Sequence, residues 1–281
     1  FRPDDSKVLS NLVVYICFPC VLIDAFQIEL TVRAAKGLIL AVIAAVAAHA
    51  FMLLVVKILE RPLGLNSIEK VSIIYTNAGY LVIPLVTAVL GEEWVFYTTA
   101  FLLVQNVMIW THGVSVLKGS AQQDIKKIFL SPNIIALAVA LLLFLAGIRL
   151  PIVLASCVES MSSLVTPASM LVIGMVIGDV DLKWVFRQKR PYLICLIRLV
   201  VIPVTAAAGL GIVERMGFHA DAEYILLIVL IAVAAPVAAI ITQLAQIYDK
   251  DVRYASVINV MSVVFCILTM PLAVLIYEMI L

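Results

Sequence analysis

The sequence has 281 residues, of which 64% are hydrophobic and 13% are charged, and its mean hydropathy is +1.17. This composition excludes an ordinary soluble domain of this length and indicates an integral membrane protein. The formal net charge of +1 gives no reason to expect a nucleic acid partner.

Nine apolar stretches alternate with short charged loops, and each stretch is long enough to cross about 30 Å of hydrocarbon as a helix. The predicted spans are 8–28, 37–57, 70–90, 94–117, 132–148, 157–178, 191–213, 224–246 and 254–280. The sequence therefore predicts an all-α polytopic membrane protein.

Positive charges fall unevenly on the two sides of such a bundle. One side holds the start of the chain and the loops near 57–70, 118–131, 179–190 and 246–253. This side carries 14 Lys and Arg residues, whereas the other side carries four. By the positive-inside rule, the start of this sequence is expected in the cytoplasm and Leu281 outside a cell (inner) membrane.

A weak internal repeat occurs at a shift of about 150 residues. The matches are Asn106-Val107-Met108 with Asn259-Val260-Met261, Pro84 with Pro236, and Pro19 with Pro167. They fall in the same order in both halves. Span 70–90 is expected to run outward and span 224–246 inward, and matched helices with opposite directions indicate an inverted repeat.

The repeat predicts two units and a linker. Residues 1–117 form the first unit with four visible helices, 118–131 form a cytoplasmic linker, and 132–281 form the second unit with five helices. Inversion requires an odd number of helices in each unit. We therefore expect the native protein to have one more helix before Phe1, which this sequence lacks.

The matched prolines predict two broken helices. Pro84 removes a hydrogen-bond donor and clashes with the carbonyl of Tyr80, and Gly79 weakens the same turn, so span 70–90 is expected to break at Tyr80. By the same rule, Pro236 is expected to break span 224–246 at Ala232. The alternative for each proline is a simple kink. In a bilayer, broken backbone survives only where protein shields it or where it lines a watery cavity.

Two broken helices that cross at the midplane create a site for an anion. The N-terminal ends of two half-helices meet there, and each is equivalent to about half a positive charge. Freed carbonyls at the opposite half-helix ends favour a cation or a proton donor, so the same geometry suits a coupling ion.

Polar and small residues near the two prolines form the candidate substrate site. The candidates are Asn77, Gly79, Tyr80, Pro84, Asn106, Pro236, Gln243 and Asn259, with Gln105 as a further polar residue inside a span. The alternative role of their amides is hydrogen bonding between helices, which contributes about 0.6 to 2 kcal/mol each.

Two ionisable residues inside spans are candidates for charge balance or proton coupling. Arg198 lies seven residues into span 191–213 and either snorkels to the cytoplasmic face or reaches inward to an anion or a carboxylate. His49 lies near the middle of span 37–57 and is either a proton relay or a neutral, hydrogen-bonded imidazole.

Signatures of catalysis and of metal or cofactor binding are absent from the sequence. The five cysteines lack zinc spacing and are interpreted as small buried hydrophobic residues. The three histidines lack His-Glu-x-x-His spacing, and the sequence contains no Gly-x-Ser-x-Gly elbow, GxGxxG or Walker loop. We therefore expect no enzyme activity, no catalytic residues, no cofactor and no metal.

A set of motifs resembles one known family. The residues are Asn77, Gly79, Tyr80, Ile83, Pro84, Gly91, Glu92 and Glu93, then Pro132, Asn133, Gly147, Ile148 and Pro151, then Thr166, Pro167, Gly174 and Met175, and finally Pro236, Ala245, Tyr248 and Asp249. Leu9, Ser10 and Pro19 are similar to the family's second helix. Over essentially its whole length the sequence resembles the auxin efflux carrier family, in particular its prokaryotic members, which include malate permeases.

The resemblance implies a ten-helix fold of two five-helix inverted repeats, similar to sodium/bile-acid symporters, whose fourth and ninth helices cross at their prolines. It also implies a scaffold domain and a transport domain that move as an elevator. The sequence departs from the family pattern at Leu81 and Val82, where smaller residues are expected, and it lacks an asparagine close to Pro236.

The expected function is secondary active transport of small organic anions such as carboxylates, coupled to protons or to the membrane potential, with sodium as an alternative coupling ion. Gly174 and Gly178 form a GxxxG pair that favours packing within the protomer, and a homodimer remains an alternative. A channel or a non-transporting receptor on a carrier fold is the alternative function.

Overall fold

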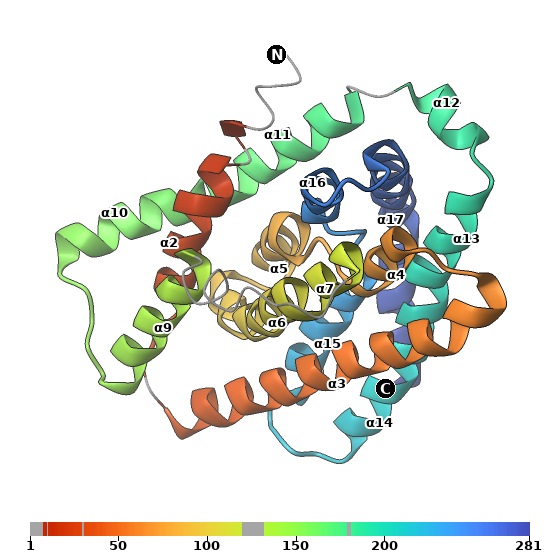
Figure 1. The fold of residues 1–281 in the computed structure, drawn as a ribbon. Helices are drawn as coiled ribbons and strands as arrows, with labels where there is room; N and C mark the ends of the chain where they lie inside the picture. Colours follow the sequence, from red (N-terminus) through yellow and green to blue (C-terminus); the bar gives the residue numbers. More distant parts are fainter. Residues whose placement is uncertain (1–7, 10, 30, 120–131, 179–180) are drawn as a thin grey trace.

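The computed structural model describes residues 8–9, 11–29, 31–119, 132–178 and 181–281, and these are almost entirely helical (Figure 1). Within these ranges, the strand-type pairing is one isolated antiparallel bridge between Thr76 and Val237. The all-α prediction is confirmed. Ser10 and most of the predicted linker 118–131 lie outside the described residues.

Within each described range, short connections join successive helices. The α-helices are α2 (Phe18–Ala25), α3 (Val32–Leu63), α4 (Ser67–Ile74), α5 (Ile83–Val89), α6 (Val95–Met108), α7 (Val114–Lys118), α9 (Pro132–Leu145), α10 (Ile152–Ser163), α11 (Val165–Gly178), α12 (Leu182–Arg187), α13 (Arg190–Leu196), α14 (Ile202–Arg215), α15 (Ala222–Ala234), α16 (Ile240–Ile247) and α17 (Val252–Ile280). The π-helical turns η1 (Val13–Cys17), η2 (Ala78–Val82), η4 (Ile109–Gly113) and η5 (Ile197–Val201), and the 3-10 turn η3 (Glu92–Trp94), join some of them.

Five helical runs among the described residues are long and apolar enough to cross a membrane. They are Val32–Leu63, Glu92–Lys118, Ile152–Val172, Arg190–Arg215 and Val252–Ile280. The other predicted spans correspond to the shorter apolar helices Val13–Ala25, Ala78–Val89, Pro132–Leu145 and Ala222–Ala234. Spans 70–90 and 224–246 are shorter because their helices are interrupted.

The helices form two layers, which we call the panel and the body. The panel consists of α2, α9, α10 and α11, and the long run of α10 and α11 follows one edge of the molecule in Figure 1. The remaining helices form the body, whose core is built from branched and small apolar residues. Aromatic rings join the layers: Phe26, at the C-terminal end of α2, lies 4.9 Å from Phe96 of α6, and Phe144 of α9 lies 5.4 Å from the same ring, between ring centroids.

One buried carboxylate fixes the start of α4. The Asn66 side chain caps the helix, and Glu69 accepts from the Asn66 backbone N–H in return, which completes a capping box. Glu69 also accepts from Arg190 Nε at 2.8 Å, Arg190 Nη2 at 3.1 Å and the Tyr254 hydroxyl at 2.7 Å. The starts of α4, α13 and α17 are therefore joined at one side chain, whose charge is paired as burial requires.

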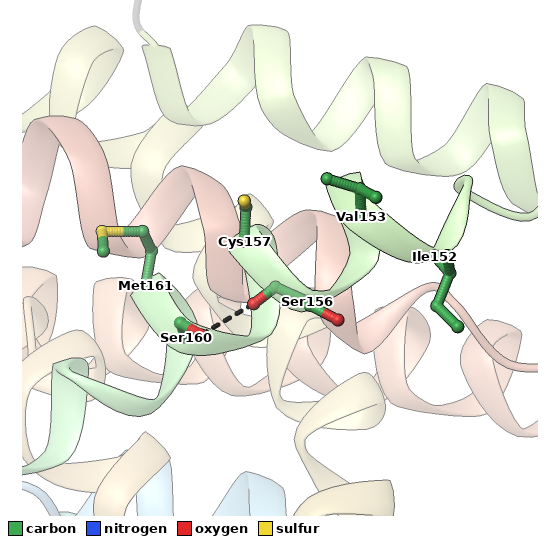
Figure 2. Close-up of a pocket in the computed structure, with 6 residues that line it drawn as sticks. All are labelled: Ile152, Val153, Ser156, Cys157, Ser160 and Met161. Atoms are coloured by element: carbon green, nitrogen blue, oxygen red, sulfur yellow. Dashed lines mark hydrogen bonds between the residues drawn. The ribbon is translucent and has the colours of Figure 1, made fainter.

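A shallow hollow of about 520 Å³ lies on α10 of the panel (Figure 2). Its lining residues are Ile152, Val153, Ser156, Cys157, Ser160 and Met161. They all come from one helix, and none is a predicted site residue. Exposed apolar side chains need no protein partner in a bilayer, because lipid tails are equally apolar. Cys157 is exposed there, so its predicted burial is wrong, whereas Cys17, Cys195 and Cys266 are buried.

Replacing Glu69 with Ala should lower the free energy of unfolding by about 2 kcal/mol, since it leaves Arg190 and Tyr254 without their acceptor. The expected loss is at the low end for a buried pair because the Arg190 side chain is 40% exposed and reaches water. Thermal denaturation in detergent measures the change. The matched control is Glu60→Ala, which breaks the more exposed pair with Lys70 and should cost less than about 1 kcal/mol. Equal losses in the two variants would contradict the assigned role of Glu69.

Candidate functional site

Two helices of the body are interrupted inside the apolar core. Helix α4 ends at Ile74, residues 75–77 are non-helical, and the chain then re-enters a helix through η2 and α5. Helix α15 ends at Ala234, residues 235–239 are non-helical, and α16 follows. Tyr75 and Ala235, which cap the first halves, have extended backbones with ψ of 131° and 154°.

The predicted positions of both breaks are wrong. Tyr80 lies inside η2 and Ala232 inside α15, so both backbones are helical. Pro84 falls in the first turn of α5, directly after the wider π turn of η2, which gives the ring room without ending the helix. Pro236 acts through the residue before it, because Ala235 is pushed out of the α region and ends α15 there.

The two non-helical segments pair with each other. The Asn77 N–H donates to the Pro236 carbonyl at 2.7 Å, and the Ala238 N–H donates to the Tyr75 carbonyl at 3.0 Å. These bonds flank the antiparallel bridge between Thr76 and Val237. We call this pairing the crossing. Each segment therefore satisfies backbone groups that the other leaves free, as a water-poor interior requires.

Gln105 of α6 clamps the first segment. Its Oε1 accepts from both the N–H and the hydroxyl of Thr76, and its Nε2 donates to the Thr76 carbonyl, each at 2.9 Å. The predicted site residue Asn106 is half-buried and takes no part in these bonds. The helical period identifies the inward position, because Thr98, Phe101 and Gln105 follow each other at spacings of three and four and are buried.

Asn259 and Ser262 of α17 clamp the second segment. Asn259 Nδ2 donates to the Val237 carbonyl at 3.0 Å, and the Val237 N–H donates to the Ser262 hydroxyl at 3.0 Å. The structure thus places Asn259 at the crossing, with its amide bonded to backbone. Ser262 was missed in the sequence, although its spacing of three residues from Asn259 puts both on one helix face.

Arg198 lies in the π turn η5 and is fully buried, with 0% of its surface exposed. Its Nη2 donates to the Ala235 carbonyl at 2.9 Å, at the C-terminal end of α15, and its Nη1 lies 3.6 Å from the Met52 sulfur. Snorkelling, one of the two alternatives, is therefore wrong. The side chain reaches inward, and its acceptor is a backbone carbonyl.

His49 of α3 is buried beneath Phe101, with 4.7 Å between the ring centroids. Its Nδ1 lies 2.8 Å from the Ala45 carbonyl, and its Nε2 is buried without a hydrogen bond to any described residue. The contact between Nδ1 and the Ala45 carbonyl is the kind of hydrogen bond that a neutral imidazole requires. A proton relay through His49 remains a prediction.

Asn77, Gly79 and Tyr80 lie at the start of the helix that leaves the crossing. The Asn77 side chain is 5% exposed and makes no hydrogen bond within the described part of the chain. Gly79 lies against the Phe18 ring of α2, where a Cβ would come within 2.6 Å of Phe18 Cζ. Phe18 in turn packs on Tyr80 with 5.5 Å between ring centroids. The candidate site therefore borders the panel.

Gln243 is exposed on α16, and the structure does not bring it to the crossing. Tyr75, which was not predicted as a site residue, anchors the first segment: its hydroxyl donates to the Met108 carbonyl at 2.9 Å and lies 2.8 Å from His112 Nδ1. Among the described residues, no group of three or more His, Cys, Asp or Glu side chains is arranged to hold a metal ion.

Replacing Gln105 with Leu should lower the free energy of unfolding by about 2 to 4 kcal/mol, because the buried N–H and carbonyl of Thr76 lose their partner. Chemical or thermal denaturation in detergent measures the loss. Asn106→Leu on the same helix is the matched control and should change stability by less than about 1 kcal/mol. A Gln105 variant as stable as the control would show that the clamp contributes little.

Gly79→Ala should destabilise the protein by about 1 to 3 kcal/mol, since the added methyl group overlaps the Phe18 ring. The second-site change Phe18→Leu frees that space, so a double-mutant cycle should give a favourable coupling of about 1 kcal/mol or more. Gly174→Ala is the control, because a Cβ there meets nothing within 4 Å. Additive effects of the Gly79 and Phe18 changes would contradict the close contact.

Comparison with known proteins identifies the family of this chain. A family model described as membrane transport protein matches residues 1–124 and 116–274, which together span nearly the whole chain. A search of curated proteins found no match. The family match confirms the resemblance found in the sequence motifs and indicates a multi-pass membrane transporter. The chain belongs to the auxin efflux carrier family of membrane transport proteins.

Proposed function

We propose that this membrane transporter is a secondary active carrier of small organic anions such as carboxylates, and that the anion binds beside the crossing. The substrate site is formed by Asn77 and the Gly79 to Pro84 backbone on one side and the Pro236 segment on the other. Asn106 and Gln243, which lie away from the hydrogen bonds of the crossing, are left out of this site.

The Asn77 side chain carries the proposal. A buried amide normally finds a hydrogen-bond partner within the protein or in ordered water. At 5% exposure, with no bond to a described residue, this amide is available to a ligand at the point where the helix restarts. Asn259 and Gln105, by contrast, are already bonded to backbone.

The charges around the crossing favour a negative ligand. The continuous helical run Ala78–Val89 and helix α16 both begin at the crossing, and their first N–H groups have no partner inside their own helices. Arg198 adds a full positive charge against Ala235. A carboxylate is the common biological group that offers two acceptor oxygens to amide donors.

We further propose that the chain consists of two inverted repeats, residues 1–117 and 132–281, joined by the linker 118–131. The panel would form the scaffold and the body the moving transport domain of an elevator. The start of the sequence is assigned to the cytoplasm and Leu281 to the outside of the cell membrane, with transport coupled to protons or to the membrane potential.

The test is binding and uptake by purified protein. Carboxylates, indole acids and amino acids are screened by thermal shift, and a hit is then measured as saturable, gradient-dependent uptake in proteoliposomes. Asn77→Ala should lower the affinity at least about tenfold, because one well-placed hydrogen bond to a charged group contributes about 1.5 to 3 kcal/mol. Gln246→Ala, an exposed change on α16, is the control and should bind normally.

Unchanged affinity in Asn77→Ala would refute its role in binding. Flux without saturation would identify a channel instead, and binding without any flux would identify a receptor on a carrier fold.

A further inference from the structure

Arg198 is a buried cation without an anionic partner among the described residues. It is fully buried, and it takes part in no salt bridge within the described part of the chain. The buried carboxylate of the described residues is Glu69, which is already bonded to Arg190. A buried charge without compensation is strongly destabilising, so the charge of Arg198 must be balanced by something other than an acidic side chain.

The C-terminal end of α15 supplies part of that balance. Arg198 Nη2 donates to the carbonyl of Ala235, the residue that caps this helix. The C-terminal end of a helix is equivalent to about half a negative charge, so it attracts a cation. In carriers with broken helices, such free carbonyl ends are where a coupling cation binds. Here a side chain of the protein occupies that position.

Four helix ends lie at the crossing, and each carries a partial charge. Helices α4 and α15 end there, and the runs that begin at Ala78 and Ile240 start there. Two C-terminal ends at about −0.5 and two N-terminal ends at about +0.5 cancel. Arg198 then leaves the crossing with a net charge of about +1.

We propose that Arg198 is a resident cation of the crossing, which replaces a coupling metal ion and matches the site to anions with a single negative charge. The inference rests on the proposed function, because it assumes that the ligand binds at the crossing. A monocarboxylate neutralises the site, whereas a dicarboxylate leaves an uncompensated charge in a medium that solvates ions poorly. Binding then needs no sodium ion.

The consequence for transport concerns the membrane potential. The loaded body carries no net charge at the crossing, whereas the empty body carries about +1. A potential that is negative inside therefore acts on the empty state and draws it toward the cytoplasm. The loaded body carries no net charge at the crossing, so the potential does not act on its movement.

The first experiment tests the resident cation without any substrate. Arg198→Ala should lower the melting temperature of the purified protein by roughly 6 to 12 °C, because it removes the partner of the helix end. Guanidinium chloride at about 50 mM should raise the melting temperature of Arg198→Ala by several degrees, since the free ion binds in the vacated space. Urea at the same concentration has a similar planar shape and N–H donors but no charge, and it should restore nothing.

Two controls sharpen this experiment. Met52→Ala opens space beside the Arg198 guanidinium but leaves the charge in place, so guanidinium should not stabilise it. Arg198→Lys keeps the charge, so its melting temperature should lie between those of the wild type and Arg198→Ala. The role of Arg198 as a resident cation would be overturned if urea and guanidinium stabilised Arg198→Ala equally. It would also be overturned if guanidinium did not stabilise Arg198→Ala.

The second experiment uses the wild-type protein, so it does not depend on how the variants fold. Monocarboxylates should shift its melting temperature equally in sodium and in choline buffers, and dicarboxylates of the same length should bind at least about tenfold more weakly. Sodium-dependent binding, or a preference for dicarboxylates, would overturn the inference while leaving the proposed function intact. If no anion binds, the proposed function fails, and the guanidinium experiment alone decides the role of Arg198.

Discussion

The structure depends on the backbone pairing between the two interrupted helices. Within an apolar core, each freed N–H or carbonyl is costly unless it finds a partner. The bonds from Asn77 to Pro236 and from Ala238 to Tyr75 let each break satisfy the other, so neither interruption is tolerable alone. Gln105 and Asn259 then complete the pairing from neighbouring helices. The rest of the body packs around the two paired segments and the helices that carry Gln105 and Asn259, and it holds them in register.

The sequence predicted the long helices well because apolar length alone identifies a segment that crosses a membrane. It located the interruptions only approximately, because proline is a local signal and the first break contains none. Residues 75–77 leave the helix because a partner segment far along the chain offers them hydrogen bonds, and no local pattern contains that information. The same reason explains why Gln105 was named only as a further polar residue and not as a site residue: its importance comes from facing Thr76.

The roles of the polar residues separate once their partners are known. Asn259 and Gln105 hold backbone, whereas the Asn77 amide has no bond to a described residue. From sequence alone all three amides could line the cavity, with hydrogen bonding between helices as the alternative role of each. Arg198 shows the same limit, because its position in a span was compatible with either direction of its side chain. Burial and a specific carbonyl partner decide the question, and both depend on tertiary packing.

The contact between Gly79 and Phe18 connects two parts of the molecule that otherwise meet mainly through broad apolar surfaces. The aromatic ring, carried by α2 of the panel, rests in the space that the missing Cβ leaves two residues after Asn77. In the proposed site, a ligand that widens this turn would push on the Phe18 ring, and a shift of the ring would alter the turn. Ligand binding at the crossing and the distance between panel and body would then be coupled through this one contact.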